Sequence, residues 1–400
     1  MNINDLLKLA VEKNASDLHL KVGSHPMARV DGALAPMMEL KRLMQEDTIQ
    51  MAYSIMNARQ KARFKEELDI DLAYSVPGLG RFRCNIFQQR GVVGMVLRVI
   101  PARIKTIREL MLPAVLEKSI AEERRGMVLC TGTTGSGKST TLASIIDHVN
   151  ANRNEHIITI EDPIEFLHRD KKSLVNQREI DVDTRTFASA LRAAMRQDPD
   201  VVLVGEMRDF ETIETALHAA ETGHLVFSTL HTLDATETIN RIISVFPPHH
   251  QKQIRIQLAQ VLKATISLRL VPRADGMGRV PAAEVMVSTP YIRDCIENKE
   301  KTKFIREQIA LGTSQYGMQT FDQSLFYLYK GGLITVEEAL KRATNPDEFK
   351  LKLQGVQFTS DEAMEQMEDQ MGILGGTDDL MNDDNLFSSD FSADDVERFG

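Results

Sequence analysis

The hydrophobic positions of the first hundred residues change their period several times over short distances. Helical spacing over Ile3–Glu12 and through Gln45–Leu68 predicts helices, whereas alternating apolar and polar residues predict strands. The predicted strands are Asp17–Val22, Ala28–Val30, Asp69–Tyr74, Arg81–Gln88 and Val92–Val99. Short strands mixed with helices indicate a small α+β domain.

The pattern changes at Gly126, where short apolar runs begin to alternate with helical segments. A helix is predicted just before this region, over Leu110–Ala121. The apolar runs predict strands at Gly126–Thr131, His156–Glu161, Val201–Gly205 and His224–Leu230. Such alternation is typical of a doubly wound α/β domain with a mostly parallel sheet. Residues 250–350 are predicted to be largely helical, with Pro346 near the end of the folded core.

These changes of pattern divide the 400 residues into four segments. We expect an α+β domain at residues 1–100, a linker at 101–112, an α/β domain with a helical C-terminal part at 113–355, and a tail at 356–400. The length suits two or three domains and allows a sizeable core.

The charge of the chain is concentrated in that tail. The chain carries 48 basic and 57 acidic residues, a net charge of −9. The last forty residues hold thirteen acidic residues and one arginine, so they carry −12 and the first 360 residues carry +3. We expect the tail to be disordered, because it has too little apolar surface to bury. Alternatively, Met371–Leu374 and Leu386–Phe391 could dock on a basic groove and fold on binding.

Several classes of protein are disfavoured by composition. The cysteines, Cys84, Cys130 and Cys295, lie far apart and form no CxxC motif, which speaks against a zinc or redox site. The chain opens with polar residues, and its apolar runs are far shorter than the roughly 18 residues that span a bilayer. We therefore expect a cytoplasmic protein without direct membrane insertion. The nearly neutral first 360 residues, without a basic patch, argue against nucleic acid as a partner.

A phosphate-binding loop follows the predicted strand at Gly126–Thr131. The matching residues of G-x-x-x-x-G-K-[ST] are Gly132, Thr133, Thr134, Gly135, Ser136, Gly137, Lys138 and Ser139, with Thr140 opening the next helix. Glycines let backbone N–H groups converge on phosphate oxygens, Lys138 would reach the β- and γ-phosphates, and Ser139 would hold Mg²⁺. The strand–loop–helix context favours this interpretation over a glycine-rich turn that binds nothing. It predicts ATP and Mg²⁺ as cofactors.

A carboxylate ends the predicted strand Val201–Gly205. Because ligands of doubly wound sheets bind outside the carboxyl ends of the strands, Glu206 would face the γ-phosphate. The usual residue here is an Asp that holds Mg²⁺, and a Glu suits positioning or deprotonating the attacking water better. The alternative is that Glu206 caps the strand or pairs with Arg208.

Three more carboxylates, Glu161, Asp162 and Glu165, follow the predicted strand His156–Glu161. Such a cluster beside a phosphate loop predicts a site for Mg²⁺ or for orienting water. The spacing does not show which of the three matters.

Two histidines, His224 and His231, flank the last predicted strand. His231 lies at the strand-to-helix corner on the ligand side of the sheet, where Asp234 and Glu237 resemble a capping box. It could sense the γ-phosphate or be structural, and position alone does not decide.

Together these motifs resemble the secretion ATPase superfamily, and within it the type IV pilus retraction ATPases of PilT-like and PilU-like type. The resemblance covers residues 1 to about 352. Its motifs are the phosphate loop Gly132–Ser139, the acidic box Ile160–Glu165, the atypical Walker B segment Asp198–Asp209, the histidine box Thr222–Thr232, and the segments Ala15–Leu20 and Gly317–Asp322.

The resemblance implies a PAS-like N-terminal domain followed by a RecA-like P-loop ATPase domain, assembled as a homohexamer. ATP would bind between the two domains of each subunit. Glu206 would be the catalytic glutamate, Glu165 its acidic-box partner, and His231 the γ-phosphate sensor. Arg81, Arg83 and Arg98 would close onto the phosphates, although a solvated basic sheet face is the alternative for these arginines.

The resemblance further implies an Mg²⁺-dependent ATP hydrolase that drives pilus retraction and twitching motility. It would act at the inner membrane through a pilus platform protein, and the resemblance allows a second retraction ATPase as a further partner. Residues 232–294 lack the tetracysteine module of assembly and type II secretion ATPases, which favours the retraction branch. Pro290–Ile296 matches its family block only in part, and the tail is longer than usual in PilT-like proteins, so a PilU-like accessory ATPase or a regulatory nucleotide-binding partner stays open. A DNA-handling ATPase is disfavoured.

Overall fold

The computed structural model describes residues 2–30, 32–101 and 103–353. The acidic tail, and with it the expectation of disorder, lies outside the described residues. The chain forms two compact units, one through Arg103 and one from Ile104, and each is described here by itself. The predicted linker segment includes Ile107 and Leu112, which are buried in the second unit. The predicted domain boundaries themselves stay a prediction.

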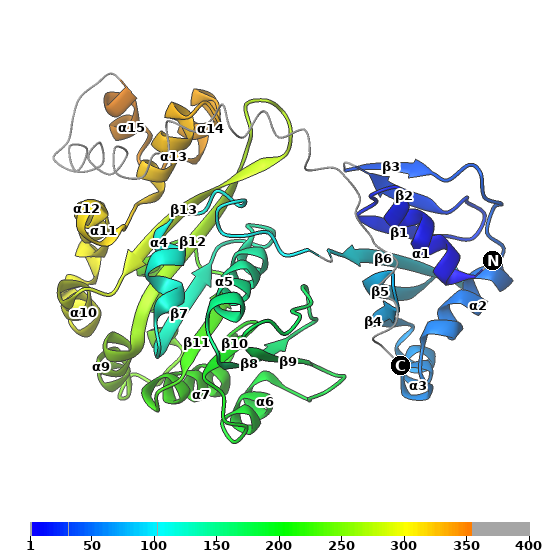
Figure 1. The fold of residues 1–400 in the computed structure, drawn as a ribbon, viewed down its shortest axis with the longest axis horizontal. Helices are drawn as coiled ribbons and strands as arrows, with labels where there is room; N and C mark the ends of the chain where they lie inside the picture. Colours follow the sequence, from blue (N-terminus) through cyan, green and yellow to red (C-terminus); the bar gives the residue numbers. More distant parts are fainter. Residues whose placement is uncertain (1, 31, 102, 354–400) are drawn as a thin grey trace. The chain divides into compact units, whose positions relative to one another are not determined.

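The first unit is an antiparallel sheet with helices packed on its core face (Figure 1). The strands are β1 (Asp17–Leu20), β2 (Met27–Val30), β3 (Ala33–Pro36), β4 (Asp69–Val76), β5 (Gly80–Gln89) and β6 (Val92–Ile100), in the order β3-β2-β1-β6-β5-β4. The helices are α1 (Ile3–Glu12), α2 (Gln45–Ile55) and α3 (Ala58–Glu67). Alternation along β5 buries Phe82, Cys84 and Ile86 against these helices and turns the arginines to the opposite face.

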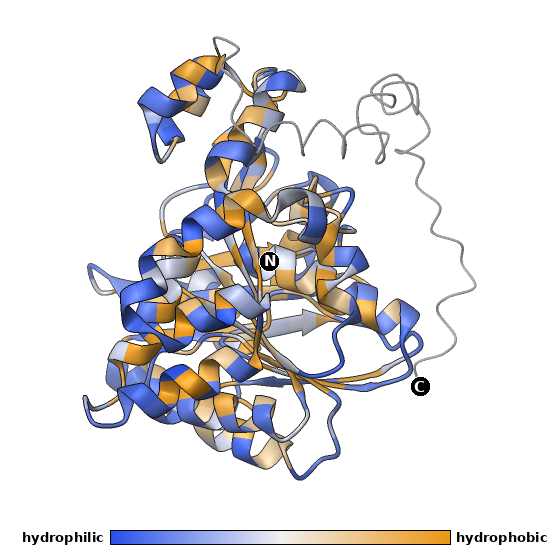
Figure 2. Ribbon diagram, turned by 90° about the vertical axis from the view of Figure 1, so that its left-hand side faces the viewer, coloured by the Kyte–Doolittle hydropathy of each residue, from blue (hydrophilic) through white to orange (hydrophobic). Residues whose placement is uncertain are grey.

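The second unit is built on a seven-stranded sheet in which every neighbouring pair of strands is parallel except the hairpin β12–β13 (Figure 1). The strands are β7 (Gly126–Thr131), β8 (His156–Glu161), β9 (Leu174–Glu179), β10 (Val201–Val204), β11 (Leu225–Leu230), β12 (Leu262–Pro272) and β13 (Arg279–Val287). Their order is β13-β12-β7-β11-β10-β8-β9. The strands β7, β10 and β11 lie inside the sheet and are buried at every position, as inner parallel strands require. The helices around the sheet carry both blue hydrophilic and orange hydrophobic residues (Figure 2).

Helices cover both faces of this sheet. On one face lie α4 (Val115–Lys118), the 3₁₀ turn Ile120–Glu122 and α5 (Lys138–Asn152). On the other lie α6 (Phe187–Ala194), α7 (Phe210–Glu221), α8 (Ala235–Ser244), α9 (Gln251–Val261), α10 (Pro290–Glu297) and α11 (Ile305–Leu311). The 3₁₀ turn Lys299–Phe304 and α12 (Thr313–Tyr316) lead to α13 (Phe321–Lys330), α14 (Val336–Arg342) and α15 (Pro346–Leu353), whose apolar residues pack on the end of the β12–β13 hairpin. The doubly wound α/β prediction is therefore confirmed, with a mixed rather than wholly parallel sheet.

Several element predictions were wrong in detail. The expected helical region 250–350 contains the hairpin β12–β13, and Leu110–Ala121 shortens to one helical turn and a 3₁₀ turn. The helix predicted over Gln45–Leu68 is two helices, because Asn57 caps α3 through a reciprocal bond with Gln60. Pro346 begins α15 rather than ending the core, since proline is favoured in the first helical turn.

No helix among the described residues is both long and apolar enough to cross a bilayer. This agrees with the short apolar runs of the sequence.

The close approach of β7 to β12 generates a stability prediction. A Cβ on Gly126 would lie 2.6 Å from the carbonyl oxygen of Val261, whereas a Cβ on Gly223 would have no heavy atom within 4 Å, although both residues have φ near +108°. Gly223→Ala should therefore cost only the backbone term, about 1–2 kcal/mol. Gly126→Ala should cost about 2–5 kcal/mol, because the strands must also separate. Thermal unfolding of the two matched variants checks this, and equal melting temperatures would contradict it.

Candidate functional site

The phosphate loop connects the end of β7 to the start of α5. Gly132, Gly135 and Gly137 all have positive φ, and Gly137 is the left-handed N-cap of α5. A Cβ on Gly132 would lie 2.5 Å from the carbonyl oxygen of Leu268 on β12, so only glycine fits there. The helix begins two residues before the predicted Thr140, which places Ser139 and Thr140 in its first turn. This geometry supplies the helix N-terminus that binds anions.

Lys138 points back into this loop. Its Nζ donates hydrogen bonds to the carbonyl oxygens of Gly132 at 2.9 Å and Thr133 at 3.1 Å. Burial lowers the pKa of Lys138, while the negative charges of Glu206 and Glu165 oppose that effect. The ammonium is thus a buried positive charge that faces two of the predicted site carboxylates.

Glu206 lies just beyond β10, between a histidine and an arginine. Its Oε1 is 3.1 Å from Nε2 of His231, and its Oε2 is 2.6 Å from Nη2 of Arg208. Burial raises the pKa of Glu206, but the hydrogen bond and charge of Arg208, helped by His231, outweigh burial and hold the pKa below its usual value. The pairing with Arg208, considered as an alternative to catalysis, therefore coexists with an ionised carboxylate at the strand end.

The backbone around Glu206 is fixed by the neighbouring strands. Gly205 N donates to the Ile160 carbonyl at 2.7 Å, and the Gly205 carbonyl accepts from Thr229 Oγ1 at 2.6 Å. Met207 N donates to the Thr229 carbonyl at 3.2 Å. Hydrogen bonds from β8 and β11 thus hold the backbone on both sides of Glu206, and this backbone directs the Glu206 side chain.

The acidic loop after β8 gives its three carboxylates different environments. The oxygens of Glu161 accept from Thr159 Oγ1 at 2.7 Å, from Gln177 Nε2 at 3.0 Å and from Glu165 N at 3.4 Å. Burial raises the pKa of Glu161 despite these bonds. Asp162 is exposed and its charge acts on Arg208, while Glu165 is exposed and its charge acts on Lys138.

Gln177 is thus a hydrogen-bond donor to the Glu161 carboxylate. It lies on β9, a strand that the sequence pattern did not predict. Glu179, on the same strand, is buried and accepts from Ile164 N at 3.2 Å, which ties down the middle of the acidic loop. The polar run through β9 carried no clear strand signal, so these two contacts could not be predicted.

The histidine corner joins β11 to α8. Asp234 is the N-cap of α8 and accepts from Glu237 N at 2.7 Å, while Glu237 accepts from Leu233 N at 2.8 Å. The resemblance to a capping box is therefore half correct, because Glu237 reaches Leu233 rather than the cap residue. His231 is 45% exposed and faces Glu206, whereas His224 lies before β11 and contacts the Ala219 carbonyl at 3.0 Å.

The N-terminal arginines belong to the first unit. Arg83 and Arg98 are directly opposite each other on β5 and β6, and Arg81 precedes them by two residues on the same face. Nε of Arg98 donates to Asp17 at 2.9 Å, and Nε of Arg83 lies 4.0 Å from Asp71. Acidic neighbours thus already partner two of these cations within their own sheet. The contact of all three with phosphate stays a prediction.

The described residues contain no group of three or more His, Cys, Asp or Glu side chains that could hold a metal ion. Mg²⁺ at a phosphate loop needs no such group, because that ion takes one or two protein ligands and completes its shell with water and phosphate. Ser139, in the first turn of α5, and the exposed Asp162 offer suitable oxygens.

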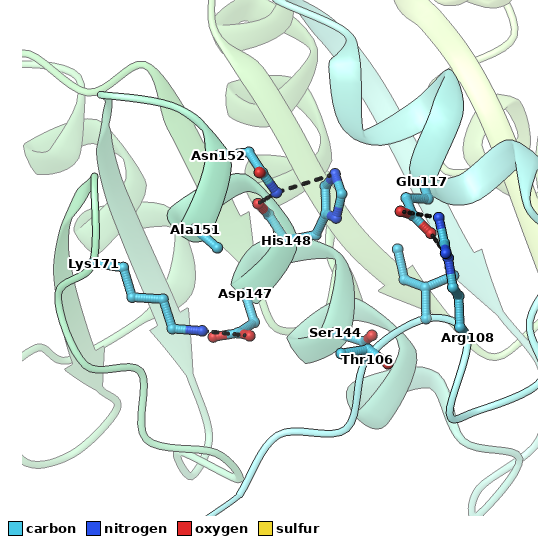
Figure 3. A pocket seen from close by; sticks show the side chains of 10 residues that line it. Thr106, Arg108, Glu117, Ser144, Asp147, His148, Ala151, Asn152 and Lys171 are labelled. Atoms are coloured by element: carbon cyan, nitrogen blue, oxygen red, sulfur yellow. Dashed lines mark hydrogen bonds and ion pairs between the residues drawn. The ribbon is translucent and has the colours of Figure 1, made fainter.

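A separate cavity of about 300 Å³ lies along the later turns of α5 (Figure 3). Its charged residues are already paired: Arg108 with Glu117 at 2.9 and 3.0 Å, and Lys171 with Asp147 at 2.8 Å. None of the predicted site residues lines it. We assign it no role in the site.

Comparison with known proteins supports an ATPase site. The type II/IV secretion system protein family matches residues 1–323. The chain is 47% identical to the type IV pilus retraction ATPase PilT of Pseudomonas aeruginosa, over 87% of this chain and all of that protein. It is 41% identical to the type IV pilus ATPase PilU of the same organism, over 88% of this chain and 91% of PilU.

Among solved structures, the pilus retraction motor PilT with bound ADP superposes with a TM-score of 0.80 at 47% identity. The match covers 87% of this chain and 98% of that one. The resemblance deduced from the motifs is thereby confirmed. The chain belongs to the type II/IV secretion system protein family and is an ATPase of the secretion type.

Proposed function

We propose that this protein is a motor that hydrolyses ATP to drive retraction of type IV pili. The observation that carries the proposal is the ionised Glu206, held between His231 and Arg208 and electrostatically coupled to Lys138 of the phosphate loop. A match to PilT along that protein's entire length supports the retraction activity. The lower identity to PilU, 41%, makes the accessory role the less favoured alternative.

The chemistry follows from the charges of the site. Backbone N–H groups of residues 132–137 and the ammonium of Lys138 would bind the phosphates. Glu206, ionised at neutral pH, would accept the proton of the attacking water. His231, which contacts Glu206 and is partly exposed, would sense the γ-phosphate. Glu165 would act as the acidic-box partner, since its charge also reaches Lys138.

Bound Mg²⁺ would neutralise phosphate charge during the transfer. Ser139 and Asp162 are the residues that fit it. Glu161, which the sequence also suggested as a ligand, already accepts three hydrogen bonds and has a raised pKa, so a role in shaping the acidic loop suits it better.

The wider assignments are proposals of the same kind. The antiparallel first unit would be the PAS-like domain, and Arg81, Arg83 and Arg98 would close onto phosphate from it. The second unit would be the RecA-like domain, and the protein would assemble as a homohexamer in the cytoplasm. The hexamer would dock peripherally on the inner-membrane platform protein of the pilus. A PilU-type ATPase would be a second partner. The acidic tail, which lies outside the described residues, would recruit partners. These proposals draw on the resemblance to pilus motors.

Replacing the proposed base tests the site. Glu206→Gln should lower kcat for ATP by at least about 100-fold, since general bases contribute 10²–10⁴-fold. Nucleotide binding, followed with a fluorescent ADP analogue, should persist in this variant and be lost in Lys138→Ala. Phosphate-release assays on purified protein measure both rates, and parental hydrolysis by either variant would refute the assignment.

The Arg208 contact predicts a pH effect. Because Arg208 lowers the pKa of Glu206, its stabilisation of the carboxylate is present above the ordinary Glu pKa and is lost as pH falls through the lowered value. Removing the cation in Arg208→Leu should raise the pKa and move the acid limb of the kcat profile to higher pH. Arg208→Lys, which keeps the charge, should move it less. An acid limb that is identical in wild type and Arg208→Leu would show that Arg208 does not tune Glu206.

Loss of the gene tests the direction of the motor. A retraction motor predicts cells with abundant pili that do not retract and no twitching motility, restored by the wild-type gene but not by Glu206→Gln. Absence of pili would instead indicate assembly, and retraction sustained by a second ATPase would indicate the accessory role.

A further inference from the structure

A buried carboxylate on the edge hairpin contacts the helix that follows the histidine corner. Glu284 lies on β13, is 5% exposed, and accepts a hydrogen bond through Oε1 from Ala235 N at 2.9 Å. Ala235 is the first residue of α8, one position after the N-cap Asp234. An acceptor at this point satisfies one of the N–H groups that a helix start leaves without an internal partner.

Glu284 belongs to a row of residues that crosses the sheet at the site edge. It pairs with Ser267 on β12, which pairs with Thr131 on β7, which pairs with Leu230 on β11. Oγ1 of Thr131 donates to Oγ of Ser267 at 2.9 Å. The phosphate loop follows Thr131 and His231 follows Leu230, so the row lies directly beneath both.

His231 of the corner contacts Glu206 beyond β10, whereas the hydrogen bonds around the start of α8 named above arise within the corner and α8. Thr232 Oγ1 lies 2.6 Å from Thr238 Oγ1. The Asp234 carboxylate accepts from Glu237 N, and the Glu237 carboxylate accepts from Leu233 N. The bond from Glu284 reaches the corner from a different element. It therefore fixes the start of α8 relative to the sheet, and not merely the shape of the turn.

Charged groups from three elements surround Glu284. Asp234 faces it from the start of α8, Arg269 from β12, and Arg306 from α11. Arg306 in turn contacts Asp322 on α13 at 2.8 Å. Burial, together with the charge of Asp234, raises the pKa of Glu284 to about 7, although the Ala235 bond and the two arginines oppose the rise.

We propose that Glu284 is a positioning residue for His231, holding the start of α8 so that the imidazole stays against Glu206. The proposal rests on the function proposed above, in which His231 acts at the γ-phosphate. The ionised carboxylate is the better acceptor for Ala235 N and the better partner for the positive end of α8. Its raised pKa means that this stronger form is gained as pH rises through about 7.

The experiment compares two replacements in full-length protein. Glu284→Gln keeps a neutral acceptor, so it should retain folding and most of kcat but lose the rise of kcat around pH 7. Glu284→Leu removes the acceptor and should lower kcat by about fivefold to tenfold with little change in KM, which is the effect of one lost hydrogen bond. Thr265→Val is the matched control: Thr265 is buried on β12 on the same face, its Oγ1 has no hydrogen-bond partner among the described residues, and the variant should behave as wild type.

Repeating both replacements in a His231→Ala background separates positioning from general destabilisation. If Glu284 acts through His231, neither replacement should change kcat by more than about twofold there, because the effects of residues that act through one group are not additive. A wild-type pH profile for Glu284→Gln, or an undiminished effect in the His231→Ala background, would overturn the proposal. Should Glu206→Gln hydrolyse ATP normally, the proposed function itself fails. If Glu206→Gln loses activity but the Glu284 variants keep the wild-type kcat and pH profile, only the inference about Glu284 is wrong.

Discussion

Four neighbouring parallel strands end at the same edge of one sheet, and the site depends on that alignment. In the order β7, β11, β10, β8, their carboxyl ends lead to the phosphate loop, His231, Glu206 and the acidic loop. The register is continuous, so residues up to a hundred positions apart in the chain meet within hydrogen-bond distance. Backbone pairing thus places the proposed catalytic groups at one edge of the sheet.

The glutamates at this edge of the sheet differ in the charge of their partners, and their pKa values differ accordingly. Burial raises the pKa of a carboxylate, and it does so at Glu161, whose hydrogen-bond partners are neutral donors. Burial also acts on Glu206, but Arg208 and His231 are its partners, and they hold its pKa below the usual value. The pKa values of two glutamates on adjacent strands are thus shifted in opposite directions, which suits the proposed roles of Glu206 as a base and of Glu161 in shaping the acidic loop.

The sequence allowed the four site strands to be predicted, with β7 and β8 correct to the residue, because each is a short apolar run bounded by polar residues. The strand-end rule then brought Glu206 and His231 together correctly. The β12–β13 hairpin was missed because α9 runs into β12 at Leu262 without a glycine or proline between them. The alternation of Ala264, Ile266 and Leu268 with polar residues was the available signal. Glu284 had no local signal, since its significance comes only from the pairing of β13 with β12.

The strand that was missed connects the two ends of the second unit. At Leu268, β12 approaches Gly132 so closely that no side chain fits between them, which packs the phosphate loop against it as one body. One residue further on, Arg269 stacks on Phe321 of α13 at 3.8 Å and donates to the Arg342 carbonyl at 2.9 Å. The phosphate loop and the C-terminal helices therefore both contact β12 directly. The same strand carries Ser267, which bonds Thr131 on one side and pairs with Glu284 on the other. Nucleotide chemistry at the strand ends and the position of the helices beyond them are thus joined through β12 by direct contacts.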